Sequence, residues 1–109
     1  LDPDFMFMIG KMTMGVLAAS EFPPDMDRAK LILDEVLEKT ERRNLMVQMS
    51  MARYYAVNAG DSQLFRDLLE EVVEAGDVLP EARLSNAIAR RRAQRYLDRI
   101  EYYFSDLSE

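Results

Sequence analysis

The stretch "DMDRAKLILDEVLEKT", residues 25–40, predicts an amphipathic helix, and a second stretch like it sets the fold. Its apolar residues recur at positions i, i+4, i+7 and i+8, which places them on one face of a helix. Asp25 is a favourable N-cap residue, so we expect the helix to run from Met26 to about Lys39. The apolar face consists of Ala29, Leu33, Val36 and Leu37.

The stretch "DSQLFRDLLEEVVEAG", residues 61–76, repeats the first one at an offset of 36 residues, with five identical positions. A period of about 34 residues with two helices per unit is typical of the tetratricopeptide (TPR) repeat. Two amphipathic helices also produce such a match by chance, and the tryptophan and closing proline of the TPR consensus are absent. We predict an all-α chain of antiparallel helix pairs that forms a fragment of a TPR-like right-handed solenoid.

Capping and breaking residues place the other helices. The Asp2-Pro3 pair favours the start of a first helix, and the prolines of "EFPPD" end it. Glycines at 60 and 76 favour the ends of the third and fourth helices, because glycine readily adopts the left-handed C′ conformation. We expect these helices at about 3–19, 45–59, 62–75 and 81–104. They would form one domain, 1–109, with repeat-like units at about 3–40 and 45–76 and a closing helix at about 81–104.

The composition excludes several classes of site. The chain has 109 residues, no cysteine, no histidine and a formal net charge of −6 at pH 7. It therefore lacks thiolate and imidazole metal ligands and any Ser–His or Cys–His pair. The excess of acidic residues argues against general nucleic-acid binding. We predict a protein that is not an enzyme and holds no cofactor or metal; the enzymatic alternative is a reaction that uses carboxylates alone.

The stretch "FMFMIGKMTMGVLAAS", residues 5–20, is apolar at all but three positions. Acidic residues precede it, and it falls short of the roughly 20 apolar residues of a membrane span. We therefore expect neither a signal peptide nor a membrane-spanning helix here. The chain begins with Leu1 rather than Met, so we expect it to be a piece of a longer protein, with any signal sequence upstream.

A helix that is apolar almost all round is buried on more than one side. One interpretation of 5–20 is core or subunit packing; the other is an adaptable surface for an apolar ligand, which methionine side chains suit. Phe7 and Met14 would need a cover from an upstream repeat, a second subunit or a ligand. The adjacent tyrosines of the third helix raise the same choice. The candidate ligand or partner surface consists of Phe5, Met8, Met12, Tyr54 and Tyr55.

The run "ARRRAQR", residues 89–95, makes the last helix basic. We expect its arginines to pair with the Glu-rich second and fourth helices or to stay solvated, while the fourth-helix carboxylates Glu70, Glu71 and Glu74 face solvent. Arg92 lies in line with Ile88 and Tyr96, an apolar stripe on which an arginine needs a carboxylate or carbonyl partner. Asn86 shares a face with small residues, where we expect it to bond the backbone of a closely packed helix. These small residues are Ala82, Ala89 and Ala93.

Four segments together resemble a known family. They are "DMDRAKLILDEVLEKTERRNLMVQ" (25–48), "ARYYAV" (52–57), "GDSQLFRDLLEEV" (60–72) and "LSNAIARRRAQRYL" (84–97). The chain resembles the T component associated with tripartite ATP-independent periplasmic (TRAP) transporters, often called the TatT family. The run from 84 to 93 is the most specific part. In this run Asn86, Arg91 and Arg92 match the motif of the family, and the resemblance implies a structural role for them.

The resemblance implies a periplasmic, all-helical protein with cryptic TPR-like repeats, attached to the membrane only through a lipid anchor upstream of this chain. It implies a homotrimer with an apolar pocket, associated with the substrate-binding subunit of a TRAP transporter. From it we expect a non-enzymatic accessory subunit that docks that subunit and shelters a small apolar ligand. The alternative is a generic TPR-like scaffold that binds a peptide or protein in its groove, with no small ligand.

Overall fold

The computed structural model describes residues 3–21, 25–76 and 78–104, and every regular element in these ranges is a helix. The prediction of an all-α chain of packed helix pairs is therefore confirmed. The α-helices are α1 (Pro3–Ser20), α2 (Met26–Lys39), α3 (Leu45–Ser50), α4 (Val57–Ala59), α5 (Ser62–Glu74), α6 (Arg83–Asp98) and α7 (Ile100–Tyr103). A π-helical segment, η1 (Met51–Ala56), joins α3 to α4, and a short 3-10 turn, η2 (Pro80–Ala82), precedes α6.

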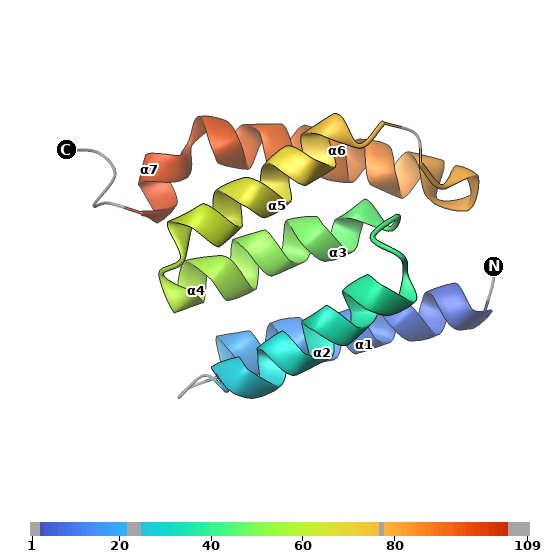
Figure 1. The fold of residues 1–109 in the computed structure, drawn as a ribbon, viewed down its shortest axis with the longest axis horizontal. Helices are drawn as coiled ribbons and strands as arrows, with labels where there is room; N and C mark the ends of the chain where they lie inside the picture. The colour runs from blue at the N-terminus through green and yellow to red at the C-terminus, as the bar shows by residue number, and fades with distance from the viewer. Residues whose placement is uncertain (1–2, 22–24, 77, 105–109) are drawn as a thin grey trace.

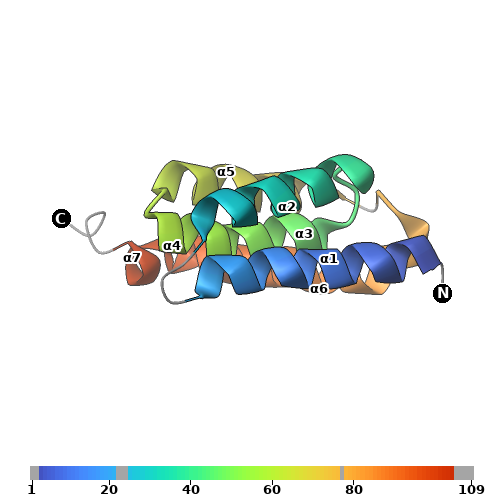
Figure 2. The same cartoon turned by 90° about the horizontal axis from the view of Figure 1, so that it is seen from below.

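The helices form two layers around a central rod. The rod is the continuous run α3–η1–α4, with the α1–α2 pair along one side and α5 and α6 along the other (Figure 1). Seen from below, α2 and α5 lie in one layer and α1 and α6 in the other, with the rod between them (Figure 2). Successive helices are antiparallel, because short connections return the chain along its neighbour.

The expected caps are present where the structure describes them. The Asp25 carboxylate accepts a hydrogen bond from the Arg28 amide at 3.2 Å, and Asp61 accepts one from the Leu64 amide at 3.0 Å. Gly60 and Gly76 adopt left-handed conformations, with φ of 70° and 73°, at the ends of α4 and α5. These contacts satisfy amide and carbonyl groups that a helix end leaves unpaired. The predicted Asp2 cap and the prolines at 23–24 lie outside the described residues.

The third helix keeps its predicted span of 45–59 but is not one α-helix. Residues Met51–Ala56 form a π-helix, which fits an extra residue into a helical turn and so rotates the residues that follow. This segment packs against α1, α2 and α5 at once. Contacts with three neighbouring helices therefore determine the π-helical conformation of this segment. No local sequence pattern predicts these contacts.

The last helix, predicted as one element over 81–104, is broken. The chain bends at Arg99, whose φ of −121° and ψ of 31° are not α-helical, and α7 follows. The bend brings two aromatic rings onto Phe65 of α5, with centroid distances of 5.6 Å to Tyr103 and 5.1 Å to Phe104. Phe65 is fully buried and Phe104 is 5% exposed. Burying these rings stabilises the fold by more than a straight helix would, because a straight helix would carry them into solvent.

The pair α1–α2 approaches closely because of one glycine. A Cβ atom built on Gly15 would lie 2.8 Å from Leu33 Cγ and 3.2 Å from Ile32 Cγ2, whereas one on Gly10 meets nothing within 4 Å. Leu33 is fully buried, so it has no free space into which it can retreat. The core face of α2 is the predicted one, with Ala29, Leu33, Val36 and Leu37 all buried.

We predict that Gly15→Ala lowers the free energy of unfolding by about 1 kcal/mol, because overpacking against Leu33 outweighs the gain in helix propensity. Gly10→Ala in the same helix is the matched control, and we expect it to raise stability by about 0.5–1 kcal/mol. Urea unfolding followed by circular dichroism measures both. Equal stabilisation by the two substitutions would contradict the close approach of α1 and α2.

Candidate functional site

The connection between α2 and α3 has an unusual backbone. Glu41 and Arg42 both have positive φ, at 54° and 58°, although neither is glycine. Such conformations are disfavoured for residues with a Cβ atom and persist only where surrounding contacts hold them. The Arg42 amide donates to the Leu37 carbonyl at 3.0 Å, which closes the end of α2. Side chains from three other helices supply further contacts to this connection.

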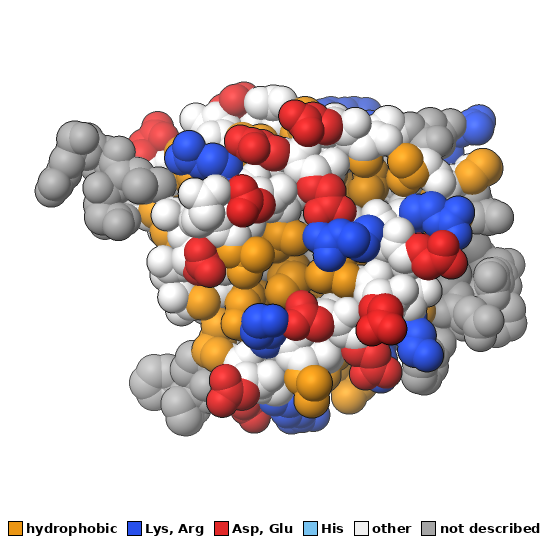
Figure 3. Space-filling view, in the orientation of Figure 1, with side chains coloured by type: hydrophobic (Ala, Val, Ile, Leu, Met, Phe, Trp, Pro, Cys, Tyr) orange, Lys and Arg blue, Asp and Glu red, His pale blue; other side chains and the backbone are white. Residues whose placement is uncertain are grey.

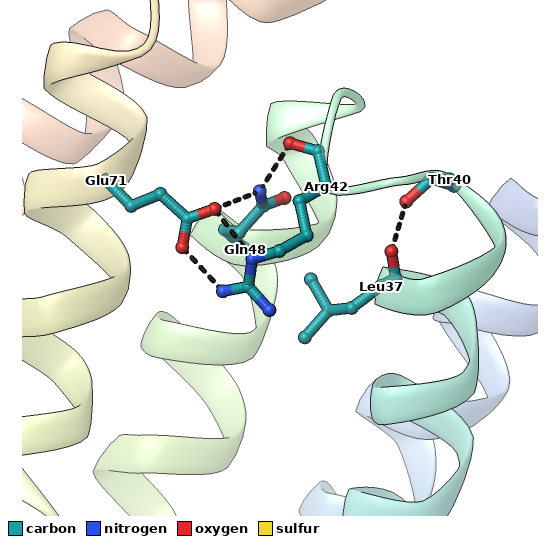
Figure 4. Close-up of polar contacts among 5 residues, drawn as sticks. All are labelled: Leu37, Thr40, Arg42, Gln48 and Glu71. Atoms are coloured by element: carbon teal, nitrogen blue, oxygen red, sulfur yellow. Dashed lines mark hydrogen bonds and ion pairs between the residues drawn. The ribbon is translucent and has the colours of Figure 1, made fainter.

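An ion pair to α5 holds the connection from one side (Figure 4). The Arg42 guanidinium donates to both carboxylate oxygens of Glu71, from Nε at 2.9 Å and from Nη2 at 2.5 Å. Gln48 of α3 is fully buried, and its Nε2 donates to the Arg42 carbonyl at 2.8 Å and to Glu71 Oε2 at 2.9 Å. The three residues thus tie α5, α3 and the connection together.

Burial and hydrogen bonding act on Glu71 in opposite directions. Burial by itself would raise the pKa of its carboxyl group. The hydrogen bonds from Arg42 and Gln48, together with the Arg42 charge, hold the pKa below its ordinary value. The expectation that Glu71 faces solvent with its neighbours is wrong for this residue. Sequence reasoning missed it because its partners lie 23 and 29 residues away along the chain.

Asn86 of α6 holds the connection from the other side. Its Oδ1 accepts from the Leu45 amide at 2.9 Å, and its Nδ2 donates to the Arg43 carbonyl at 2.9 Å. Asn86 is fully buried and lies between Ala82 and Ala89 on the inner face of α6. Its side chain therefore pairs the first amide of α3, which no helical carbonyl can reach. We call four residues together the clasp: Arg42, Gln48, Glu71 and Asn86.

The tyrosines of η1 face different surroundings. Tyr55 is partly buried and packs against both the main core and the small cluster formed by Ala18, Ala19 and Ala29. Tyr54 is 39% exposed. The guanidinium carbon of Arg53 lies 5.2 Å from the centroid of the Tyr54 ring and 4.8 Å from that of Tyr103. At these distances the arginine is attracted to both ring faces.

The structure brings some, but not all, of the residues of the candidate ligand surface together at the rod. Met8 and Met12 of α1 are partly buried and pack against the main core, as Tyr55 does. Tyr54 instead lies at the surface beside Arg53. The side chain of Phe5 lies outside the described residues. The structure thus brings Met8, Met12 and Tyr55 to one core and leaves Tyr54 at its edge.

The arginines of α6 lie mostly in solvent. Arg91 and Arg92 are exposed, and so are Arg95 and Arg99. The expectation that Arg92 needs a buried partner is wrong, because α6 turns its small residues inward and Arg92 outward. Arg90 donates to the Gly76 carbonyl at 2.6 Å. In the described part of the chain, no salt bridge joins an α6 arginine to α2 or α5.

The face that carries α2 and α5 is the other distinctive surface. Apolar side chains form a strip between these two helices, with acidic and basic groups along its edges (Figure 3). A separate hollow of about 300 Å³ lies between α5 and the α6–α7 bend, lined by Arg66, Glu70, Leu97 and Ile100. Both features are open surfaces suited to contact with another molecule.

Two searches of the described residues, 3–21, 25–76 and 78–104, are negative. They contain no group of three or more acidic side chains arranged to hold a metal ion. Nor does any described helix have the length and hydropathy needed to cross a membrane.

These features define an all-α protein of packed helix pairs whose distinctive surfaces are open faces. The family model described as TRAP transporter T-component matches residues 1–104, and the chain belongs to this family. The family is that of a transporter component, which associates this chain with a TRAP transport system. Neither the curated proteins nor the solved structures contain a match to the chain.

We predict that Asn86→Ala lowers the free energy of unfolding by about 2–4 kcal/mol, because it leaves the buried Leu45 amide and Arg43 carbonyl unpaired. The control is Gln94→Ala on the same helix, which removes an exposed amide bonded to Asp98 at 3.0 Å. We expect less than about 0.5 kcal/mol for the control. Chemical denaturation separates the two, and equal effects would contradict the role of Asn86 in the clasp.

We predict that Glu71→Gln costs about 1 kcal/mol at neutral pH, because it removes the charge that Arg42 pairs with. Since the folded pKa of Glu71 is lowered, its contribution is present above the ordinary value of 4.5 and is lost as pH falls through the folded pKa. The stability difference between wild type and variant should therefore shrink in acid. Glu70→Gln, at an exposed neighbour, is the control and should show no such trend.

Proposed function

We propose that the chain is a non-enzymatic accessory subunit of a TRAP-type solute transport system in the periplasm, where it docks the substrate-binding subunit. The observation that carries this proposal is the family match over residues 1–104. An arrangement of two helix layers, with Cα extents of 44 × 30 × 16 Å, supports it, because a thin slab offers broad faces for its size. A docking subunit needs such faces and needs no catalytic group.

We further propose that the fold is a fragment of a TPR-like right-handed solenoid within one domain, 1–109. The repeated stretches at 25–40 and 61–76 form α2 and α5, which lie in the same layer (Figure 2). Each follows a helix that packs against it, α1 and the α3–α4 rod respectively. Equivalent sequence in equivalent positions is what a repeat architecture produces.

The proposed function includes shelter for a small apolar ligand, at a surface formed by Phe5, Met8, Met12, Tyr54 and Tyr55, and assembly as a homotrimer. Two observations support the surface. Met8, Met12 and Tyr55 are only partly buried, so an incoming ligand or subunit has apolar area left to cover. The rod is π-helical where the tyrosines lie, and π-helical turns often occur at functional sites.

A second candidate function is a scaffold that binds a peptide or protein and no small ligand. The apolar strip between α2 and α5 favours it, because a groove with an apolar floor and charged edges suits an amphipathic segment (Figure 3). The two candidates differ in what they bind, a small apolar ligand or a peptide or protein, so the bound species distinguishes them.

We predict that native mass spectra of the protein, purified without detergent, show a trimer that carries an extra small apolar mass. Tyr54→Ala should reduce the fraction that carries this mass, because it removes an exposed ring from the proposed surface. Leu31→Ala on α2, where Leu31 is 71% exposed, is the control and should leave the bound fraction unchanged. Thermal unfolding of each variant checks that the fold is intact.

A bare monomer that still binds the purified substrate-binding subunit would favour the scaffold. Binding that is unchanged in Tyr54→Ala and in Met12→Ala, once stability is corrected for, would remove these residues from the proposed surface. Absence of any binding to the substrate-binding subunit would contradict the docking function itself.

A further inference from the structure

The outward face of α6 carries a row of exposed arginines. Its inward face consists of Asn86, Ala89 and Ala93, which are fully buried. At about 100° per residue, the opposite face begins at Leu84 and continues through the arginines. Leu84 is 76% exposed and Tyr102, beyond the end of α6, is 83% exposed. The arginine ridge is defined as Leu84, Arg91, Arg92, Arg95, Arg99 and Tyr102.

Four cations elsewhere in the described chain have carboxylate partners, which the arginines of the ridge lack. Salt bridges join Lys11 to Glu35, Lys30 to Asp34, Arg42 to Glu71 and Arg43 to Glu41. The four arginines of the ridge take part in no such pair. Arg91 and Arg95 are four residues apart, as are Arg95 and Arg99, a spacing at which like charges destabilise a helix. The fold therefore gains no ion pair from this row, and its exposed guanidinium groups are available to carboxylates of another molecule.

We propose that the arginine ridge docks an acidic surface of a protein partner. A guanidinium group binds a carboxylate through two parallel hydrogen bonds, which makes arginine the preferred cation for such contacts. The ridge contains no lysine, and arginine and tyrosine are enriched among the residues that dominate binding energy. Because Asn86 and its alanine neighbours fix α6 against the rod, the arginines extend from a rigid helix.

Charge distribution favours a protein over an anionic lipid surface. Residues 81–104 hold six arginines and three acidic residues, whereas the rest of the chain holds eight basic and 17 acidic residues. A lipid surface is extended and uniformly negative, so it would also repel a chain whose formal net charge is −6. A protein partner can place its carboxylates opposite the ridge alone.

The size of the ridge also suits a protein interface. From Leu84 to Arg95 it extends about 17 Å along α6 at the rise of a helix, and Arg99 and Tyr102 follow at and after the bend. Protein interfaces of standard size take about 800 Å² from each partner, a patch that accommodates this length. The two ends of the ridge, Leu84 and Tyr102, offer apolar contacts on either side of the charged centre.

The test uses the substrate-binding subunit of the same transport system, so the inference rests on the proposed function for the identity of the partner. Association of the purified subunit with the full chain is measured by surface plasmon resonance at about 50 and about 300 mM salt. The variant is Arg91→Glu with Arg95→Glu, and a milder one replaces the same residues with Gln. The control is Arg28→Glu with Lys39→Glu, an equal charge change at exposed positions of α2.

We expect the ridge variant to lose affinity about tenfold or more, mainly through slower association, and to depend less on salt than wild type. The control should stay within about twofold of wild type. Circular dichroism checks folding, and the Gln variant replaces the Glu variant if the latter unfolds.

Four outcomes would overturn the inference, and they differ in what else they affect. Equal loss in the ridge variant and the control would show a general charge effect, while wild-type affinity in the ridge variant would move docking elsewhere; both leave the proposed function standing. Absence of wild-type binding overturns the proposed function and this inference together. Vesicles of phosphatidylethanolamine and phosphatidylglycerol are assayed in parallel, and ridge-dependent binding to vesicles alone would assign the ridge to lipid.

Discussion

The fold depends on the clasp around the connection between α2 and α3. Two residues of this connection, Glu41 and Arg42, hold a left-handed backbone that their side chains disfavour. Glu71, Gln48 and Asn86 reach it from three different helices, where Glu71 accepts from the Arg42 side chain and the two amides pair the Arg42 and Arg43 carbonyls. Because each contact joins the connection to another helix, the turn that reverses the chain also aligns α3, α5 and α6.

The chain departs from α-helical geometry at two places, in the rod and at the C-terminal bend. A π-helical turn at 51–56 lets Tyr55 contact both core clusters. The bend at Arg99 brings Tyr103 and Phe104 onto Phe65 and places Tyr103 against Arg53. In both places the irregular backbone allows apolar and aromatic side chains to contact the core. The rings of Tyr54 and Tyr102 lie outside the core and are exposed.

Charge is separated between the two layers in a way that bears on docking. Acidic groups dominate α2 and α5, and three basic residues outside α6, namely Lys11, Lys30 and Arg42, pair with them. The arginines of α6 lie in the other layer and take no part in these pairs (Figure 2). Under the proposed docking function, such an arrangement gives directional association, because complementary fields orient the encounter.

The sequence by itself determined the helices, their caps and the inward face of α2, because these depend on spacing and on residues a few positions apart. The alanines around Asn86 likewise indicated a close helix contact. The tertiary structure decided the partners of Glu71, the π-helical turn, the bend at Arg99 and the outward direction of Arg92. Each of these depends on residues that are distant in the chain, as Gln48 and Glu71 are, with a separation of 23 residues. Local sequence patterns do not predict such contacts.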